Sequence, residues 1–149
     1  MKPKGKLKNS EQKLGYSIPS QRKTKAILRD LPLEMSFRFY EEIGKPTAQV
    51  ATSLLDFCDK LASAQSLQLR FSLAFHMKRG DFVAWIKQAV GDSELANKIG
   101  EISADDQDLA EKLYHAVDNR IKQLKEAAIE YTIIPEDRDA LKYVELAHY

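Results

Sequence analysis

The chain has 149 residues, of which 44% are hydrophobic and 30% are charged. These values are typical of one globular domain and exclude a chain that is disordered throughout. The net charge of +1 hides an asymmetry, because residues 1–30 carry nine basic and two acidic residues, whereas the others carry 14 basic and 20 acidic ones.

Neither a signal peptide nor a membrane helix is expected. The charged N-terminus is not followed by an apolar stretch, and no apolar run approaches the roughly 20 residues that cross a bilayer. We therefore expect a cytoplasmic protein without membrane contact. The single cysteine, Cys58, excludes an internal disulfide bond, and its apolar surroundings predict a buried side chain rather than a nucleophile.

Residues 1–25 are expected to form a flexible basic tail. Prolines and glycines interrupt any helix there, and no apolar periodicity appears. Such a segment cannot bury enough apolar surface to offset the entropy lost on ordering. Its cations could bind the phosphates of a nucleic acid or the acidic remainder of the chain. The candidate nucleic-acid contacts are Lys2, Lys4, Lys6, Lys8, Arg22, Lys23 and Lys25.

Residues 26–149 are expected to form a single all-α domain, a compact multi-helix bundle with a long C-terminal helix. A short helix is predicted over about 34–43, with Gly44 and Pro46 ending it. Its aromatic residues indicate that it docks on the core.

The next helix is predicted to begin at Ser53. This serine is an N-cap candidate, and Asp56 three residues later can complete a capping box. The apolar residues from Leu54 to Ala62 then cover a broad face, as in a core helix.

Residues 66–77 fit two structures. Large apolar residues alternate with polar or small ones, which is typical of a strand, but the same residues also form helical rows. Nothing else in the chain alternates as well, and an unpaired strand would leave backbone groups unsatisfied. We therefore predict a buried helix with Ser66 as its N-cap.

Two Gly-Asp pairs are the clearest helix boundaries in the chain. Gly80 is predicted to end one helix and Asp81 to cap the next. Gly91 and Asp92 repeat the pattern, so Asp92 or Ser93 should start a further short helix that ends at Gly100.

The longest helix is predicted to begin with Ser103 as its cap and to continue for about 28 residues, or roughly 42 Å. This length exceeds the needs of a small core, so its far end could pack on a second copy of the chain. A last helix is predicted over 136–146, after Pro135.

His76 and Arg79 are the candidate functional residues, because they stand beside Gly80 and Asp81 in the densest set of reactive side chains. Together they could bind an anion or a carboxylate at a corner between helices. The alternative is architectural: Asp81 caps a helix, and Arg79 pairs with an acidic residue. We identify no catalytic residues, no metal-binding pattern and no cofactor motif, so an enzyme is not favoured.

The run from Phe75 to Ile86 reads Phe-His-Met-Lys-Arg-Gly-Asp-Phe-Val-Ala-Trp-Ile. It resembles an uncharacterised family of small all-helical domains from archaea and bacteria, with the pattern Phe-His-x-x-Arg-Gly-Asp-Phe-x-x-Trp-Ile. The resemblance covers about 37–102 and implies a helical fold and an archaeal or bacterial cytoplasmic protein. Because it is a domain of unknown function, it implies no catalytic or ligand-binding residue.

Three hypotheses about function follow. The first is a non-enzymatic interaction or regulatory module, which binds a protein partner or a second copy of itself through helical surfaces. The second is nucleic-acid binding through the basic tail. The third is binding of a small molecule or anion at the corner of His76 and Arg79.

Overall fold

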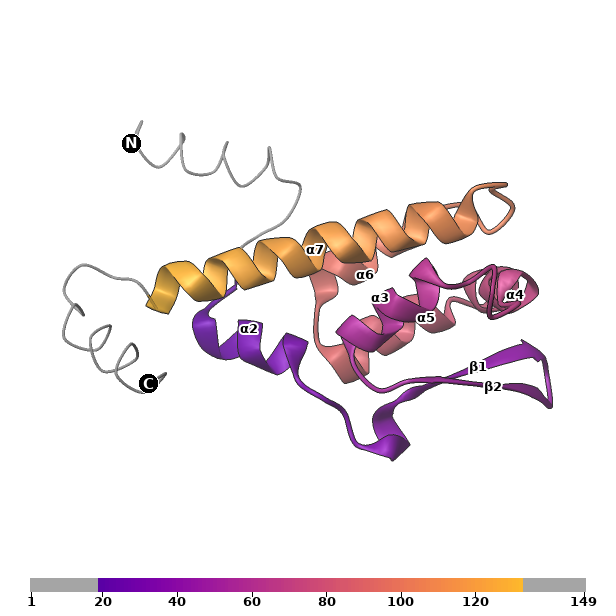
Figure 1. Ribbon diagram of the computed structural model, residues 1–149, viewed down its shortest axis with the longest axis horizontal. Coiled ribbons are helices and arrows are strands. Elements are labelled where there is room, and N and C mark those ends of the chain that lie inside the picture. Colours follow the sequence, from indigo (N-terminus) through magenta and orange to yellow (C-terminus); the bar gives the residue numbers. More distant parts are fainter. Residues whose placement is uncertain (1–18, 133–149) are drawn as a thin grey trace.

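The computed structural model describes residues 19–132, and the last helix predicted from the sequence, over 136–146, lies outside them. Helices dominate, and one antiparallel hairpin accompanies them (Figure 1). In chain order the elements are α2 (Gln21–Leu28), the 3₁₀ turn η1 (Leu33–Met35), β1 (Phe37–Glu42), β2 (Lys45–Ala51), α3 (Leu54–Ala62), α4 (Arg70–Arg79), α5 (Asp81–Trp85), the π-helical turn η2 (Ile86–Val90), α6 (Ser93–Gly100) and α7 (Leu109–Thr132).

Helix α7 runs along one side of the molecule, and the shorter helices pack against it (Figure 1). Helices α2, α3, α4 and α6 all contact α7, while the hairpin lies on the side of α3 and α4 that faces away from it. The hairpin therefore forms one outer face of the described domain, with β1 packed on α4 and β2 on α3.

The prediction of an all-α fold is wrong because of this hairpin. The segment predicted as a helix over 34–43 forms η1 and β1 instead, and Gly44 forms the turn with a φ of 75°. Phe37 and Phe39 point into the core, whereas Arg38 between them is exposed, which is the alternation of a strand.

The pairing of the two strands is irregular. Phe37 lies opposite Ala51 and Arg38 opposite Val50, but Tyr40 lies opposite Pro46, so the register shifts. The Thr47 hydroxyl donates to the Phe39 carbonyl oxygen over 2.8 Å and accepts from the Gln49 N–H over 3.0 Å. A side chain thus replaces backbone pairing at this bulge.

An aromatic cluster joins the hairpin to the helices. The ring of Phe37 lies 5.0 Å from that of Phe82 and 5.6 Å from that of Trp85, and Phe57 stacks on Phe39 at 6.0 Å between ring centres. The Trp85 indole N–H also donates to the Met35 carbonyl over 2.8 Å. The base of the hairpin is therefore held by buried aromatic packing and by a hydrogen bond.

The helix predicted over 66–77 is present as α4, but it begins at Arg70 rather than at Ser66. Leu69 occupies the N-cap without a side-chain bond, and Gln68 before it has a φ of 57°. The Ser66 hydroxyl donates to the Ser63 carbonyl within the preceding turn instead of capping α4. The left-handed backbone at Gln68 redirects the chain and delays the start of the helix.

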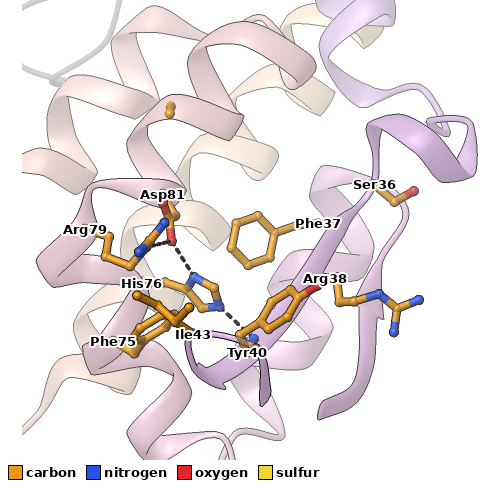
Figure 2. Close-up of a pocket in the computed structure, with 11 residues that line it drawn as sticks. Ser36, Phe37, Arg38, Tyr40, Ile43, Phe75, His76, Arg79 and Asp81 are labelled. Carbon is orange, nitrogen blue, oxygen red and sulfur yellow. Dashed lines mark hydrogen bonds and ion pairs between the residues drawn. The ribbon is translucent and has the colours of Figure 1, made fainter. Parts of the chain in front are cut away.

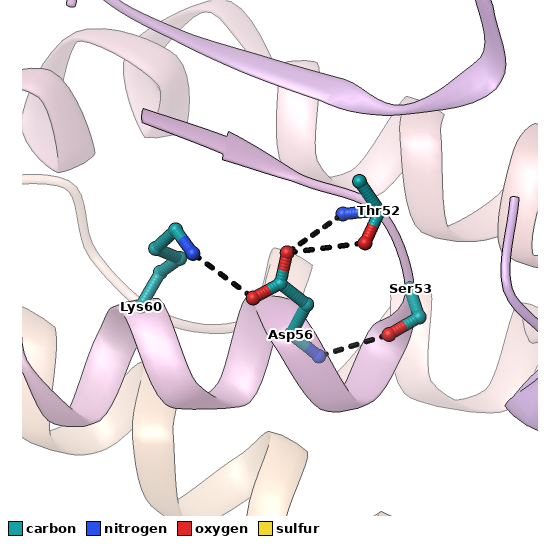
Figure 3. Close-up of polar contacts among 4 residues, drawn as sticks. All are labelled: Thr52, Ser53, Asp56 and Lys60. Atoms are coloured by element: carbon teal, nitrogen blue, oxygen red, sulfur yellow. Dashed lines mark hydrogen bonds and ion pairs between the residues drawn. The ribbon is translucent and has the colours of Figure 1, made fainter. Parts of the chain in front are cut away.

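The cap at Ser53 has the geometry of a helix start (Figure 3). Its hydroxyl accepts the Asp56 N–H over 3.0 Å, and the Asp56 carboxylate accepts the Thr52 N–H over 2.9 Å. Lys60 pairs with the same carboxylate at 2.9 Å. These bonds keep the pKa of Asp56 below its usual value even though partial burial opposes them.

The predictions for Asp81 and Ser103 as helix caps are wrong. Gly80 is the N-cap of α5, and the Asp81 carboxylate makes other contacts. Helix α7 begins six residues after Ser103, whose hydroxyl accepts the Asp105 N–H in a separate turn. Asp106 likewise accepts the Asp108 N–H. Short polar side chains that bind nearby N–H groups favour turns over helix, which explains the late start.

Candidate functional site

A cleft of about 640 Å³ opens between the hairpin and the corner of α4 and α5. We call it the hairpin cleft. It brings together both candidate residues from the sequence, His76 and Arg79, with side chains of β1 and the hairpin turn (Figure 2). The apolar part of its lining comes from Phe37, Ile43, Phe75 and Ala84, and the polar part from Ser36, Arg38, Tyr40, Arg79 and Asp81.

His76 fastens α4 to the hairpin. It is buried, with 3% of its surface exposed, and its Nε2 accepts the Tyr40 N–H over 2.8 Å. Its Nδ1 lies 2.8 Å from Oδ2 of Asp81. Because a backbone N–H can only donate, Nε2 must be unprotonated, and the ring proton must therefore be on Nδ1, donated to Asp81. The imidazole in this arrangement is neutral.

Desolvation by burial lowers the pKa of His76 below its usual value, and the charge of Arg79 acts in the same direction. The hydrogen bond and the charge of Asp81 oppose this change without reversing it. The donated Tyr40 N–H adds to the lowering, because only the neutral ring can accept it.

Asp81 and Arg79 form the rim of the hairpin cleft. Arg79 donates through Nε to Oδ2 of Asp81 over 3.1 Å, and its guanidinium lies 5.3 Å from the centre of the Phe75 ring. The side chain of Arg79 is about half exposed. Because the side chain is half exposed, its guanidinium is accessible to a ligand carboxylate or phosphate.

The geometry favours binding over catalysis at this cleft. A general base needs a free acceptor within reach of a substrate proton, but both ring nitrogens of His76 are engaged by Tyr40 and Asp81. The thiol of Cys58 is buried, and desolvation raises its pKa to about 11, so it is protonated at neutral pH. Within 19–132 no His, Cys, Asp and Glu side chains are grouped in a way that could hold a metal ion.

A second hollow, of about 660 Å³, lies on the other side of α4, where it meets the loop before α7. We call it the Phe71 groove, because Phe71 stands on it with 77% of its surface exposed. The helix predicted to be buried over 66–77 is buried on one side only: the buried residues of α4 are Ser72, Leu73 and His76, and Phe71 is not among them.

Helix α4 thus presents an outward face between the two hollows. We define the α4 surface as Arg70, Phe71, Phe75, Lys78 and Arg79 together with Ile43 of the hairpin turn, which is 80% exposed. Sequence reasoning missed Arg38, Tyr40 and Ile43 as parts of a site, because it did not predict the hairpin that carries them.

Three of the candidate nucleic-acid contacts fall within the described residues. Arg22, Lys23 and Lys25 are exposed on α2, which begins at the Ser20 cap, although the sequence analysis includes them in the tail. Lys2, Lys4, Lys6 and Lys8 lie outside the described residues. None of the three described cations lines the hairpin cleft.

No family model, no curated protein and no solved structure matches the chain. The resemblance of Phe75–Ile86 to an uncharacterised helical family therefore stays a prediction. In the part of the chain that the structure describes, no helix combines the length and apolar character needed to cross a bilayer.

Proposed function

We propose that the protein is a non-enzymatic interaction module that binds an acidic segment of a partner protein across the α4 surface. The observation that carries the proposal is that exposed aromatic and basic side chains share one helix, between two hollows. Helix α4 contains three Lys or Arg and no acidic residue, although the chain beyond residue 30 is acidic overall.

The apolar part of the α4 surface supplies affinity. Phe71 and Phe75 are four residues apart, so they are neighbours on the helix, and Ile43 shares the hairpin cleft with Phe75. Covering such side chains contributes about 25 cal/mol per Å² of apolar surface removed from water. Aromatic anchors beside hollows are typical of the residues that dominate binding energy at interfaces.

The charges of the α4 surface favour an acidic partner. Arg70 forms no ion pair with any residue of 19–132, nor does Arg38 of the adjoining hairpin cleft, and Lys78 contacts Asp105 only at 3.9 Å in an exposed pair. Exposed pairs of this kind contribute roughly 0–1 kcal/mol, so partner carboxylates can replace them at little cost. Complementary charge then provides specificity and a faster encounter.

The fold weakens the case for self-association. That case rested on the length of the longest predicted helix, whose far end had no partner assigned within the chain. However, α2 packs on α7, and Leu124 and Ala127 near that end are buried. Nucleic-acid binding through α2 and the residues before it also stays a prediction, because no described hollow combines those cations with aromatic side chains.

Selection of peptides from a random display library against the full chain tests the proposal. We expect the selected peptides to be rich in Asp and Glu, with apolar residues three or four positions apart. Fluorescence anisotropy should then show that Phe71→Ser and Arg79→Glu each weaken peptide binding by about tenfold or more.

Two substitutions outside the α4 surface serve as matched controls. Ile129→Ser removes an apolar side chain that is 56% exposed on α7, and Lys25→Glu reverses an exposed charge on α2. Both should leave peptide binding unchanged. Selection of basic peptides, or unchanged binding by the two α4 variants, would contradict the proposal.

A further inference from the structure

We propose that His76 is a proton-operated latch: its protonation releases the distal part of the hairpin, residues 40–46, from α4 and so opens the hairpin cleft. The latch regulates the α4 surface, and its effect on a partner rests on the proposed function. The release itself is a property of the free protein and can be measured without any partner.

The latch depends on the polarity of one hydrogen bond. In the neutral state Nε2 of His76 accepts the Tyr40 N–H over 2.8 Å (Figure 2). A protonated imidazole donates through both nitrogens and accepts through neither. Two donors would then face each other at the buried edge of β1. Unless the strand moves away, the Tyr40 N–H has no acceptor and an imidazolium stays out of water.

The hairpin is built so that only its distal part can move. Its base is held by Phe37 and Phe39 in the aromatic cluster and by the bond from Trp85 to Met35. Beyond Tyr40 the residues of the turn are exposed, and the register shifts on both sides of Tyr40 interrupt the ladder. His76 is therefore the polar contact that ties this end of the hairpin to α4.

The groups that face His76 determine how readily it takes up a proton. On its own helix Arg79 disfavours the charged ring, whereas on α5 Asp81 favours it through a hydrogen bond and its charge. On β1 the ring of Tyr40 lies 6.4 Å away, and Arg38 lines the same cleft. Phe37, Phe75 and Phe82 surround the rest of the imidazole and withhold water from it.

The direction of the pH effect follows from these contacts. Burial holds the pKa of His76 in the closed state below the usual value of 6.5, which a released, hydrated ring would regain. The closed state is therefore fully favoured above pH 6.5 and loses its advantage as the pH falls. Each pH unit below that value raises the ratio of open to closed hairpin by at most about tenfold, until the pKa of the closed state is reached.

Amide hydrogen exchange by NMR, corrected for intrinsic rates, tests the latch between pH 7.5 and 5. We expect the protection of the Tyr40 amide to fall as the pH is lowered, while the amides of α7 remain protected. Heteronuclear NMR of the imidazole should find His76 with its proton on Nδ1 at pH 7.5. The His76 resonance should change over the same pH range as the Tyr40 protection.

His76→Gln supplies the decisive comparison, because its side-chain oxygen can accept the Tyr40 N–H but does not titrate in this range. Protection of Tyr40 should then be independent of pH. His115→Gln is the matched control, since His115 is exposed on α7 beside Glu111, and it should behave like the wild type. Tyr40 protection that falls equally in His76→Gln, or that persists after His76 is protonated, would overturn the latch.

The peptides selected against the α4 surface separate the two proposals. If the latch operates, the wild type should lose affinity below about pH 6 and His76→Gln should lose less. A latch seen by exchange without any peptide binding would contradict the proposed function alone. Peptide binding with pH-independent Tyr40 protection would contradict the latch alone.

Discussion

Asp81 and Asp92 both follow a glycine that ends a helix, and both bind an arginine, yet their surroundings differ. Asp92 caps α6 by accepting the Leu95 N–H, and it also receives two bonds from Arg120, at 2.7 and 3.0 Å. This pair is buried, with 1% of each residue exposed. Asp81 caps nothing and lies at the rim of the hairpin cleft, where it contacts His76 and Arg79.

In both cases a residue far away in the sequence, or on another element, decides what the local Gly-Asp pattern becomes. Both aspartates stand in a Gly-Asp pair, with both glycines in the left-handed conformation. Arg120 of α7 makes Asp92 part of the core, while His76, one turn before Gly80, draws Asp81 away from the cap position. The buried pair of Asp92 and Arg120 stabilises the fold, whereas the pair of Asp81 and Arg79 is partly exposed beside the hairpin cleft.

The largest effect should come from Asp92→Asn. The amide oxygen can still cap α6, but Arg120 loses its counter-charge inside the core. Breaking a buried pair on one side costs about 3–5 kcal/mol, so we expect a loss of that order in the free energy of unfolding, measured by urea denaturation at pH 7. A loss below about 1 kcal/mol would show that the pair is effectively solvated.

Substitution of the two glycines should cost similar free energies of unfolding, unlike substitution of the two aspartates. Gly80 and Gly91 have φ values of 74° and 91°, and an added Cβ would meet nothing within 4 Å at either one. Only backbone strain is therefore introduced, so Gly80→Ala and Gly91→Ala should each cost about 1–2 kcal/mol in thermal or urea unfolding.

Gly100 provides the control for this prediction. It lies in α6 without a positive φ, and an added Cβ would sit at an ordinary 3.6 Å from Val83. Gly100→Ala should be neutral or stabilising by up to about 1 kcal/mol. Clearly unequal losses of unfolding free energy in Gly80→Ala and Gly91→Ala would contradict this prediction. They would mean that the contacts of the neighbouring aspartates also influence the cost of each substitution.

The smallest effect should come from Asp81→Asn. The carboxylate is partly exposed, and its pair with Arg79 lies at the surface, so solvent already offsets much of the attraction. We expect less than about 1 kcal/mol of destabilisation at pH 7, measured in the same urea titrations. A loss as large as that of Asp92→Asn would remove the contrast between the two clusters.

Local rules predicted much of the helical part of the fold. The Ser53 cap and the glycine stops at Gly80 and Gly91 depend on contacts within a few residues, so they can be read from short segments. The hairpin depends on β2, whose residues from Thr47 to Ala51 are small or polar except Val50 and lack a strong alternation. Without a visible partner, β1 was assigned to a helix.

The candidate site was predicted in part for the same reason. His76 and Arg79 stood out because reactive residue types gather around Gly80. Tyr40, which binds His76, did not stand out because it lies on the unpredicted strand, and Phe71 did not because the helix over 66–77 was predicted to be buried. Arg120 shows the limit most clearly, because its burial on α7 is matched by a contact with Asp92, which is far away in the sequence.

The bulge at Thr47 also bears on how the protein behaves at high concentration. A lone hairpin at the edge of a domain is a template on which strands of other molecules can add. Here the register shifts beside Tyr40, and Pro46 has no N–H to offer to an incoming strand. The hairpin is thereby guarded against edge-to-edge polymerisation, so it can form a cleft wall without recruiting further strands.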